Sequence, residues 1–305
     1  MDIIIQQVIN GMTLGMMYAL LALGFTMVYG IMGLINFAHF NVFMVGAFAG
    51  LLALQGFGVH EGQGLSIGAM IGILLVVLIA VMTFTGALGM VIERISLRPM
   101  RGVQGTGPMI ATIGINFILL NIVLIATSGQ PSHVPDILPS TAWSVGATRF
   151  SLKQALVWVV AVALMGGLNT MMQRTRLGKA MRAAAADGEA ARMMGIDVDR
   201  IVVFTFFFGS ALAGAVGLVF ALYYAQIDFQ IGYLPGLRAF TAAVFGGIGN
   251  VKGAMVGGLS IGLIEAFTSE IVGAGWSDAV IFAILVAVLA FRPAGLLGRV
   301  QAQRA

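Results

Sequence analysis

The chain has 305 residues, of which 59% are hydrophobic and only 9% are charged, and its mean hydropathy is +1.01. A soluble domain carries about 25% charged residues, so this composition excludes a soluble globular protein and predicts an all-α polytopic membrane protein. The net charge of +4 does not indicate nucleic-acid binding, because the basic residues lie in loops, as membrane topology requires. The lack of cysteine excludes disulfides and thiolate chemistry, and the three widely spaced histidines form no metal-binding motif.

Eight apolar segments are long enough to cross a bilayer, which takes about 20 helical residues. The first segment lacks the basic region of a secretory signal, so we count it as a span. The predicted spans are 8–30, 37–57, 66–92, 108–127, 154–172, 201–224, 254–274 and 277–291. A ninth apolar stretch, Leu237 to Ile248, covers only about half of the hydrocarbon core. We therefore expect a single transmembrane domain, 1–305, of about eight helices plus a short discontinuous or re-entrant segment.

Basic residues assign the two sides of the membrane. The positive-inside rule places three basic clusters in the cytoplasm: Arg94, Arg98 and Arg101; six residues within 173–200; and Arg292, Arg299 and Arg304. Segments 58–65, 128–153 and 225–236 then face outward. Eight crossings alone would put 173–200 and the C-terminus on opposite sides. A crossing or re-entrant segment at 237–250, with Lys252 on the inner side, removes this conflict and leaves the N-terminus outside.

Glycines recur four residues apart within the predicted spans. The pairs are Gly11 and Gly15, Gly46 and Gly50, Gly68 and Gly72, and Gly258 and Gly262, the last followed by Ala266. Small residues at this spacing let helix backbones approach closely in lipid. We expect most of these glycines to serve helix packing, and a minority to leave room for a solute.

Polar side chains inside spans are costly and are therefore candidates for function. The candidates are Asn36, His39, Asn41, Thr112, Asn116, Asn121 and Glu265. Structural roles compete with functional ones at each position. The asparagines can form interhelical hydrogen bonds, and His39 can cap or bridge helix ends. Glu265 can pair with Arg238 or Lys252, because a lone carboxylate in a span needs a partner, water or a proton.

The segment 173–200 is a polar island between long apolar runs. It holds six of the 16 basic and four of the 12 acidic residues. Good helix formers fill it, and its glycines predict two short helices joined by a turn at Asp187-Gly188. A solvated loop would not need such order, so we interpret it as a docking surface for a cytoplasmic partner. The chain has no Walker A string, HExxH or G-x-S-x-G motif, so ATP, if used, binds to another subunit.

The string EAARMMG, Glu189 to Gly195, looks like the cytoplasmic coupling loop of ABC importer permeases. Six further stretches extend the resemblance over about 5–298, and the chain resembles the branched-chain amino acid ABC transporter permease family, LivH type. The matching stretches are GMTLGMMYALLALGFTMVYG (11–30), INFAHF (35–40), LRPMRG (97–102), ATIGINFILLN (111–121), RTRLGKAMRAAAADGEAARMMGID (174–197), GLRAFTAAVFGGIGNVKGAMVGGLSIGLIE (236–265) and FRPAGLLG (291–298). Phe40 and Asn41 depart from the family, in which a glycine and an acidic residue often follow NFAH.

The resemblance implies an importer subunit of the bacterial inner membrane that has no ATPase site of its own. Its partners would be membrane lipid, a second permease of LivM type, two cytoplasmic ATPases that bind the ATP, and a periplasmic substrate-binding protein. The coupling residues would be Asp187, Glu189, Ala190, Ala191 and Gly195. The pathway residues would be Asn36, His39, Asn41, Asn116 and Glu265.

Two alternatives remain from the sequence. Urea, short amides or aromatic acids could replace branched-chain amino acids as the cargo of the same importer class. A stand-alone secondary transporter would need paired intramembrane charges for ion coupling, and Glu265 is essentially the one such charge that the sequence reveals. An intramembrane enzyme lacks any nucleophile–base or metal set.

Overall fold

The computed structural model describes residues 2–61, 66–100, 105–138, 141–145, 148–292 and 294–298. The α-helices are α1 Asp2–Met32, α2 His39–Gly56, α3 Ile67–Ile92, α4 Gly107–Ala126, α5 Leu152–Arg174, α6 Arg176–Ala186, α7 Gly188–Met193, α8 Val198–Tyr224, α9 Tyr233–Gly246, α10 Val251–Ile271 and α11 Ser277–Phe291. The strands are β1 Ser132–His133, β2 Ala142–Val145, β3 Thr148–Ser151 and β4 Gln226–Ile227. A π-helical turn, Glu93–Leu97, continues α3, and 3₁₀ turns occupy Arg98–Met100 and Ala274–Trp276.

The helices confirm the predicted all-α membrane architecture. Within the described ranges, eight helices are long and apolar enough to cross a membrane, and they correspond to the eight predicted spans. The predicted span 277–291 coincides with α11, whereas α1 begins at Asp2 rather than at residue 8. Arg101, Arg299 and Arg304, counted above with the inner basic clusters, lie outside the described residues, as do parts of the loops 58–65 and 128–153.

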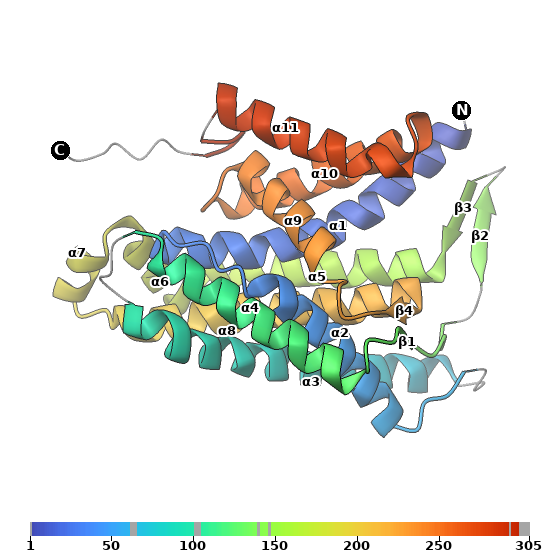
Figure 1. Cartoon of the computed structure of the whole chain (residues 1–305), viewed down its shortest axis with the longest axis horizontal. Coiled ribbons are helices and arrows are strands. Elements are labelled where there is room, and N and C mark those ends of the chain that lie inside the picture. The colour runs from blue at the N-terminus through green and yellow to red at the C-terminus, as the bar shows by residue number, and fades with distance from the viewer. Residues whose placement is uncertain are drawn as a thin grey trace.

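Loops at the two ends of the bundle define its orientation (Figure 1). Helices α6 and α7 lie at one end, and two small antiparallel sheets, β1–β4 and β2–β3, lie at the other. The backbone N–H of Arg149 in β3 donates to Oε1 of Gln6 at 2.8 Å, so α1 starts at the sheet end. With the basic island 173–200 in the cytoplasm, the N-terminus lies on the outer side, in agreement with the charge argument.

The short ninth segment completes the topology. Helix α9 has 14 residues, which corresponds to about 21 Å. Before it, β4 pairs with β1 at the outer end, and Gly232 lies against Phe40 and Asn41 of α2. Its last residues receive hydrogen bonds from the chain after α11, with Leu296 N donating to the Phe245 oxygen at 2.8 Å. The chain therefore crosses the bundle as a turn at 229–232 followed by a short helix, which returns α10 and the C-terminus to the sides that the charges require.

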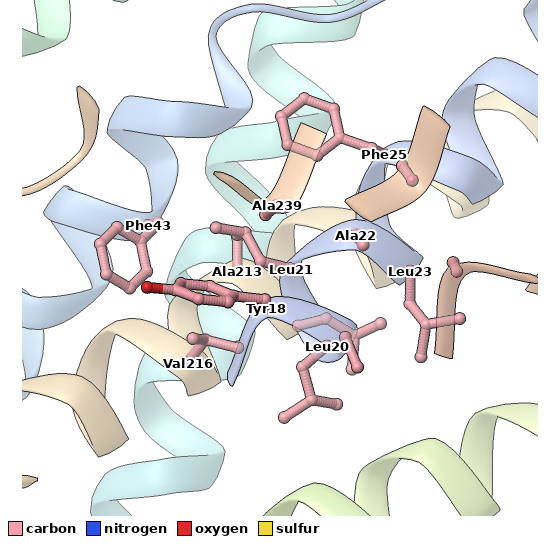
Figure 2. Close-up of a cluster of buried hydrophobic side chains, with 14 of the residues drawn as sticks. Tyr18, Leu20, Leu21, Ala22, Leu23, Phe25, Phe43, Ala213, Val216 and Ala239 are labelled. Atoms are coloured by element: carbon pink, nitrogen blue, oxygen red, sulfur yellow. The ribbon is translucent and has the colours of Figure 1, made fainter. Parts of the chain in front are cut away.

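Helices α1 and α8 form the centre of the bundle. Helix α1 packs against α10, α8 and α9, while α8 also contacts α2 and α3. Figure 2 shows Tyr18, Leu21 and Phe25 of α1 among buried side chains of α2, α8 and α9, labelled Phe43, Val216 and Ala239. Helices α3, α4, α5 and α11 lie at the periphery, with most of their surface exposed.

Glycines create the closest helix contacts, as their spacing predicts. A Cβ on Gly258 would lie 2.3 Å from the Cα of Ala19, and one on Gly15 would lie 2.8 Å from the Cα of Leu259, so α1 and α10 touch backbone to backbone. Gly46 meets α8 in the same way. Gly68 and Gly72 differ, because a Cβ on either would have nothing within 4 Å among the described residues.

Candidate translocation and coupling sites

The loop between α1 and α2 turns back into the bundle. Helix α1 ends at Met32, and Gly33, with φ +65°, adopts a left-handed conformation that glycine takes without steric cost. His39, the first residue of α2, lies beside Leu21 of α1, eleven residues before Met32, a distance of about 16 Å along the helix. The second span therefore begins inside the bundle rather than at its cytoplasmic end, which the sequence did not predict.

Side chains hold the two residues that precede α2 in place. Asn36 Oδ1 accepts from the N–H of Ala38 at 3.1 Å, and Thr112 Oγ1 of α4 accepts from the N–H of Phe37 at 3.2 Å. His39 is 1% exposed, and its Nε2 lies 3.2 Å from the carbonyl oxygen of Leu21. The imidazole therefore bridges α2 to α1, while the first N–H groups of α2 donate to backbone oxygens of 36–38.

Two asparagines connect α2 to α4. Asn41 Nδ2 donates to the backbone oxygen of Asn116 at 2.7 Å. The side-chain oxygen Oδ1 of Asn116 is buried and accepts no hydrogen bond from the described part of the chain. Asn121, in contrast, is exposed and donates to the carbonyl of Phe117 in its own helix at 2.8 Å. Asn41 thus links α2 to α4, while the side-chain oxygen of Asn116 remains able to accept a hydrogen bond.

Aromatic rings close the space between α1, α2 and α9. Phe25 contacts the rings of Phe40 and Phe240 at centroid distances of 5.3 and 6.2 Å, and Phe37 contacts the same two rings at 5.8 and 6.3 Å. A small pocket adjoins this cluster and is lined by Phe25, Tyr29, Ile35, Phe240, Ala243 and Ile248. Its walls are aromatic and aliphatic, and in this conformation it is too small to admit an amino acid side chain.

A second polar group, the Arg238 cluster (Tyr18, Arg238, Glu265 and Asp278), joins α1, α9, α10 and α11. Arg238 Nη1 donates to Glu265 Oε1 at 2.5 Å and to the Tyr18 hydroxyl at 3.1 Å. Arg238 Nε and Nη2 both lie 2.8 Å from Asp278 Oδ1. Of the two partners predicted for Glu265, the structure selects Arg238.

The predicted pathway residues therefore fall into two groups. Asn36, His39, Asn41 and Asn116 surround the start of α2, whereas Glu265 lies in the Arg238 cluster. Helix α1 contacts both groups. Tyr18 belongs to the Arg238 cluster, and Leu21, about one turn further along α1, contacts His39. Pathway roles for these residues remain predictions.

The polar island forms the two predicted short helices, α6 and α7. They meet at Asp187, whose Oδ1 accepts from the N–H groups of Glu189 and Ala190 at 3.0 and 2.9 Å, so this aspartate caps α7. Glu189 and Ala190 are exposed, whereas Ala191 is 5% exposed and faces the protein. Gly195, with φ +82°, ends the element as predicted.

Sequence reasoning missed several members of these sites. Arg238 was considered only as a partner of Glu265, and Tyr18, Asp278 and the phenylalanines were not singled out. Asp278 carried a usable signal, because it is an acidic residue inside the predicted span 277–291. Tyr18 and the phenylalanines carried none, since aromatic residues are ordinary in apolar helices.

Comparisons with known proteins decide the family. The model of the branched-chain amino acid transport system permease component family matches residues 7–289. The chain belongs to this family. It is 39% identical over 310 residues to the high-affinity branched-chain amino acid transport system permease protein BraD of Pseudomonas aeruginosa, covering 98% of this chain and 97% of the relative. It is 36% identical over 308 residues to LivH of Escherichia coli, with the same coverage. No solved structure gives a significant match.

Family membership and architecture together give the general function. The chain is a multi-pass transport permease component of the bacterial inner membrane, and a component of a transport system works with partner subunits. A more distant relative, the probable branched-chain amino acid transport permease protein LivH of Methanocaldococcus jannaschii, is 28% identical over 92% of this chain and 88% of its own length.

Proposed function

We propose that this permease is one of two membrane subunits of an ATP-driven importer that carries branched-chain amino acids inward. The printed names of full-length relatives at 36–39% identity support this cargo. The void between α1 and α9 has aromatic and aliphatic walls, which is the lining that a route for aliphatic side chains needs. The printed names of these relatives do not mention urea or short amides, which makes such solutes poorer candidates.

The partners proposed for this chain are a second permease of LivM type, two cytoplasmic ATPases and a periplasmic substrate-binding protein. The ATPases bind the ATP, and this chain contributes no catalysis of its own. The α6–α7 element carries the proposal for the ATPases. It projects from the cytoplasmic end of the bundle (Figure 1) and exposes Met193 and Met194 to 89% and 82%. Two such exposed apolar side chains on a solvated helix favour a protein partner.

Coupling follows from how this element is attached. Helix α6 follows α5 across a single residue, Thr175, and α7 leads into α8, the most buried helix beside α1. Arg182 Nη1 donates to the carbonyl of Met172 in α5. A force on α7 from closing ATPases therefore reaches α5 and α8 directly, and α8 contacts α1, α2 and α3.

A charge reversal on the exposed face tests the coupling proposal. Glu189→Lys should reduce both the ATPase subunits that co-purify with the permease and cargo uptake by at least about tenfold, because an interface charge of the wrong sign costs more than about 1.4 kcal/mol. Quantitative pull-down and uptake into proteoliposomes measure the two effects. Glu61→Lys, the same charge reversal at an exposed position on the outer side, should retain the ATPases. Full retention by Glu189→Lys would contradict docking at α7.

A further inference from the structure

The Arg238 cluster carries an unbalanced charge in the interior of the bundle. One guanidinium faces two carboxylates, Glu265 and Asp278, so the cluster has a net charge of −1 when all three are ionised. The hydrogen bonds from Arg238 use only one oxygen of each carboxylate. Glu265 is 9% exposed, and its second oxygen, Oε2, is buried without a hydrogen-bond partner among the described residues.

An uncompensated carboxylate oxygen in a membrane span is costly. Its partners are normally a cation, a hydrogen-bond donor or water, because lipid offers none of these. Arg238 divides its donors between Glu265, Asp278 and Tyr18, and the Tyr18 hydroxyl interacts with the carboxylate of Glu265. Neither neighbour brings a second positive charge, so the charge balance of the cluster favours one more cationic donor.

The cluster is also open to the surface of the isolated chain. The side chain of Asp278 is 34% exposed and that of Arg238 is 17% exposed. Leu234, one helical turn before Arg238 on the same face of α9, is 43% exposed. Charged groups within spans face protein or a water-filled cavity rather than lipid. This face of α9 thus lies toward a path or another subunit rather than toward lipid.

We infer that the Arg238 cluster is a binding subsite for the primary ammonium group of the cargo, with Glu265 as the principal acceptor and Asp278 as the second. This inference rests on the proposed transport of amino acids. An ammonium has three donors and one positive charge, which balances the cluster and supplies the partner that Glu265 Oε2 lacks. Arg238 and Tyr18 position the carboxylate of Glu265.

Ligand binding to charge-neutralised variants tests the inference. The sample is the assembled permease complex in detergent without its binding protein, and the probes are L-leucine, 3-methylbutylamine, which keeps the ammonium, and 4-methylpentanoate, which lacks it. Glu265→Gln should weaken binding of leucine and 3-methylbutylamine by at least about tenfold, because a hydrogen bond to an ionised group is lost. Asp278→Asn should act in the same direction, and 4-methylpentanoate should bind both variants as it binds the wild type.

Controls separate this role from a structural one. Glu270→Gln removes a carboxylate from the same helix at the outer end, where Glu270 accepts from Gln7 at 2.8 Å, and should leave all three affinities unchanged. Three results would overturn the inference: wild-type affinity of Glu265→Gln for both ammonium probes, equal weakening for all three probes, or no binding of ammonium probes to the wild type. Wild-type uptake of branched-chain amino acids with ATP and binding protein tests the proposed function separately, so either proposal can fail alone.

Discussion

At the scale of single residues, the contacts that hold this permease together depend on the absence of side-chain atoms. Gly258 in α10 lies so close to α1 that a Cβ there would be 2.3 Å from the Cα of Ala19. Gly72 in α3 has the same sequence spacing to a neighbouring glycine but nothing within 4 Å among the described residues. The same substitution should therefore have opposite effects at the two positions.

Gly258→Ala should lower the free energy of unfolding by about 1–3 kcal/mol, since backbone atoms must move to admit the methyl group. Gly72→Ala should be neutral or should stabilise by up to about 1 kcal/mol, because alanine is the better helix former. Thermal unfolding of the purified chain in detergent, followed by tryptophan fluorescence, compares the two variants. Equal destabilisation by both variants would contradict the prediction, because it would mean that Gly72 is packed as closely as Gly258.

At the scale of elements, α2 is the unusual helix, because it starts inside the bundle and is attached to α4 by side chains. Asn41 Nδ2 donates to the backbone oxygen of Asn116 in α4, and Thr112 Oγ1 of α4 accepts from the N–H of Phe37, two residues before α2. Helix α4 is otherwise peripheral and mostly exposed. These polar bonds supplement the packing of α4 against α2.

Asn41→Leu should destabilise the chain by about 1 kcal/mol, because the variant removes the hydrogen bond that Asn41 Nδ2 donates to the backbone oxygen of Asn116. It should also reduce cargo uptake by assembled transporters in proteoliposomes. Asn121→Leu is the matched control, since Asn121 bonds only within α4 and is exposed; it should change stability by less than about 0.5 kcal/mol. An Asn41→Leu variant as stable as Asn121→Leu would mean that the α2–α4 bond contributes little.

At the scale of the whole molecule, the arrangement of the two ends, combined with the positive-inside rule, predicts the orientation in the membrane. The small sheets and the start of α1 lie at one end, and α6 and α7 lie at the other (Figure 1). The natural chain contains no cysteine, so a single introduced cysteine reports one position without a background signal.

Ser144→Cys in β2 should react with a membrane-impermeant maleimide added to intact spheroplasts, because Ser144 is exposed at the outer end. Met194→Cys, at a position 82% exposed in the wild-type chain, should react only after the membrane is permeabilised. Labelling yield on a gel provides the measurement. The reverse pattern would invert the topology and place α6 and α7 outside.

The sequence by itself determined the class of protein, the eight spans, the two-helix island and the family resemblance. These depend on local hydrophobicity, on charge placement and on helix-ending residues such as Asp187 and Gly195, which act within a few residues of the chain. Only the tertiary structure decided that α2 begins beside Leu21, that α9 completes a crossing, and that Tyr18, Arg238 and Asp278 gather around Glu265. Those contacts join residues tens to hundreds of positions apart, and an apolar helix pattern gives no information about which partner it meets.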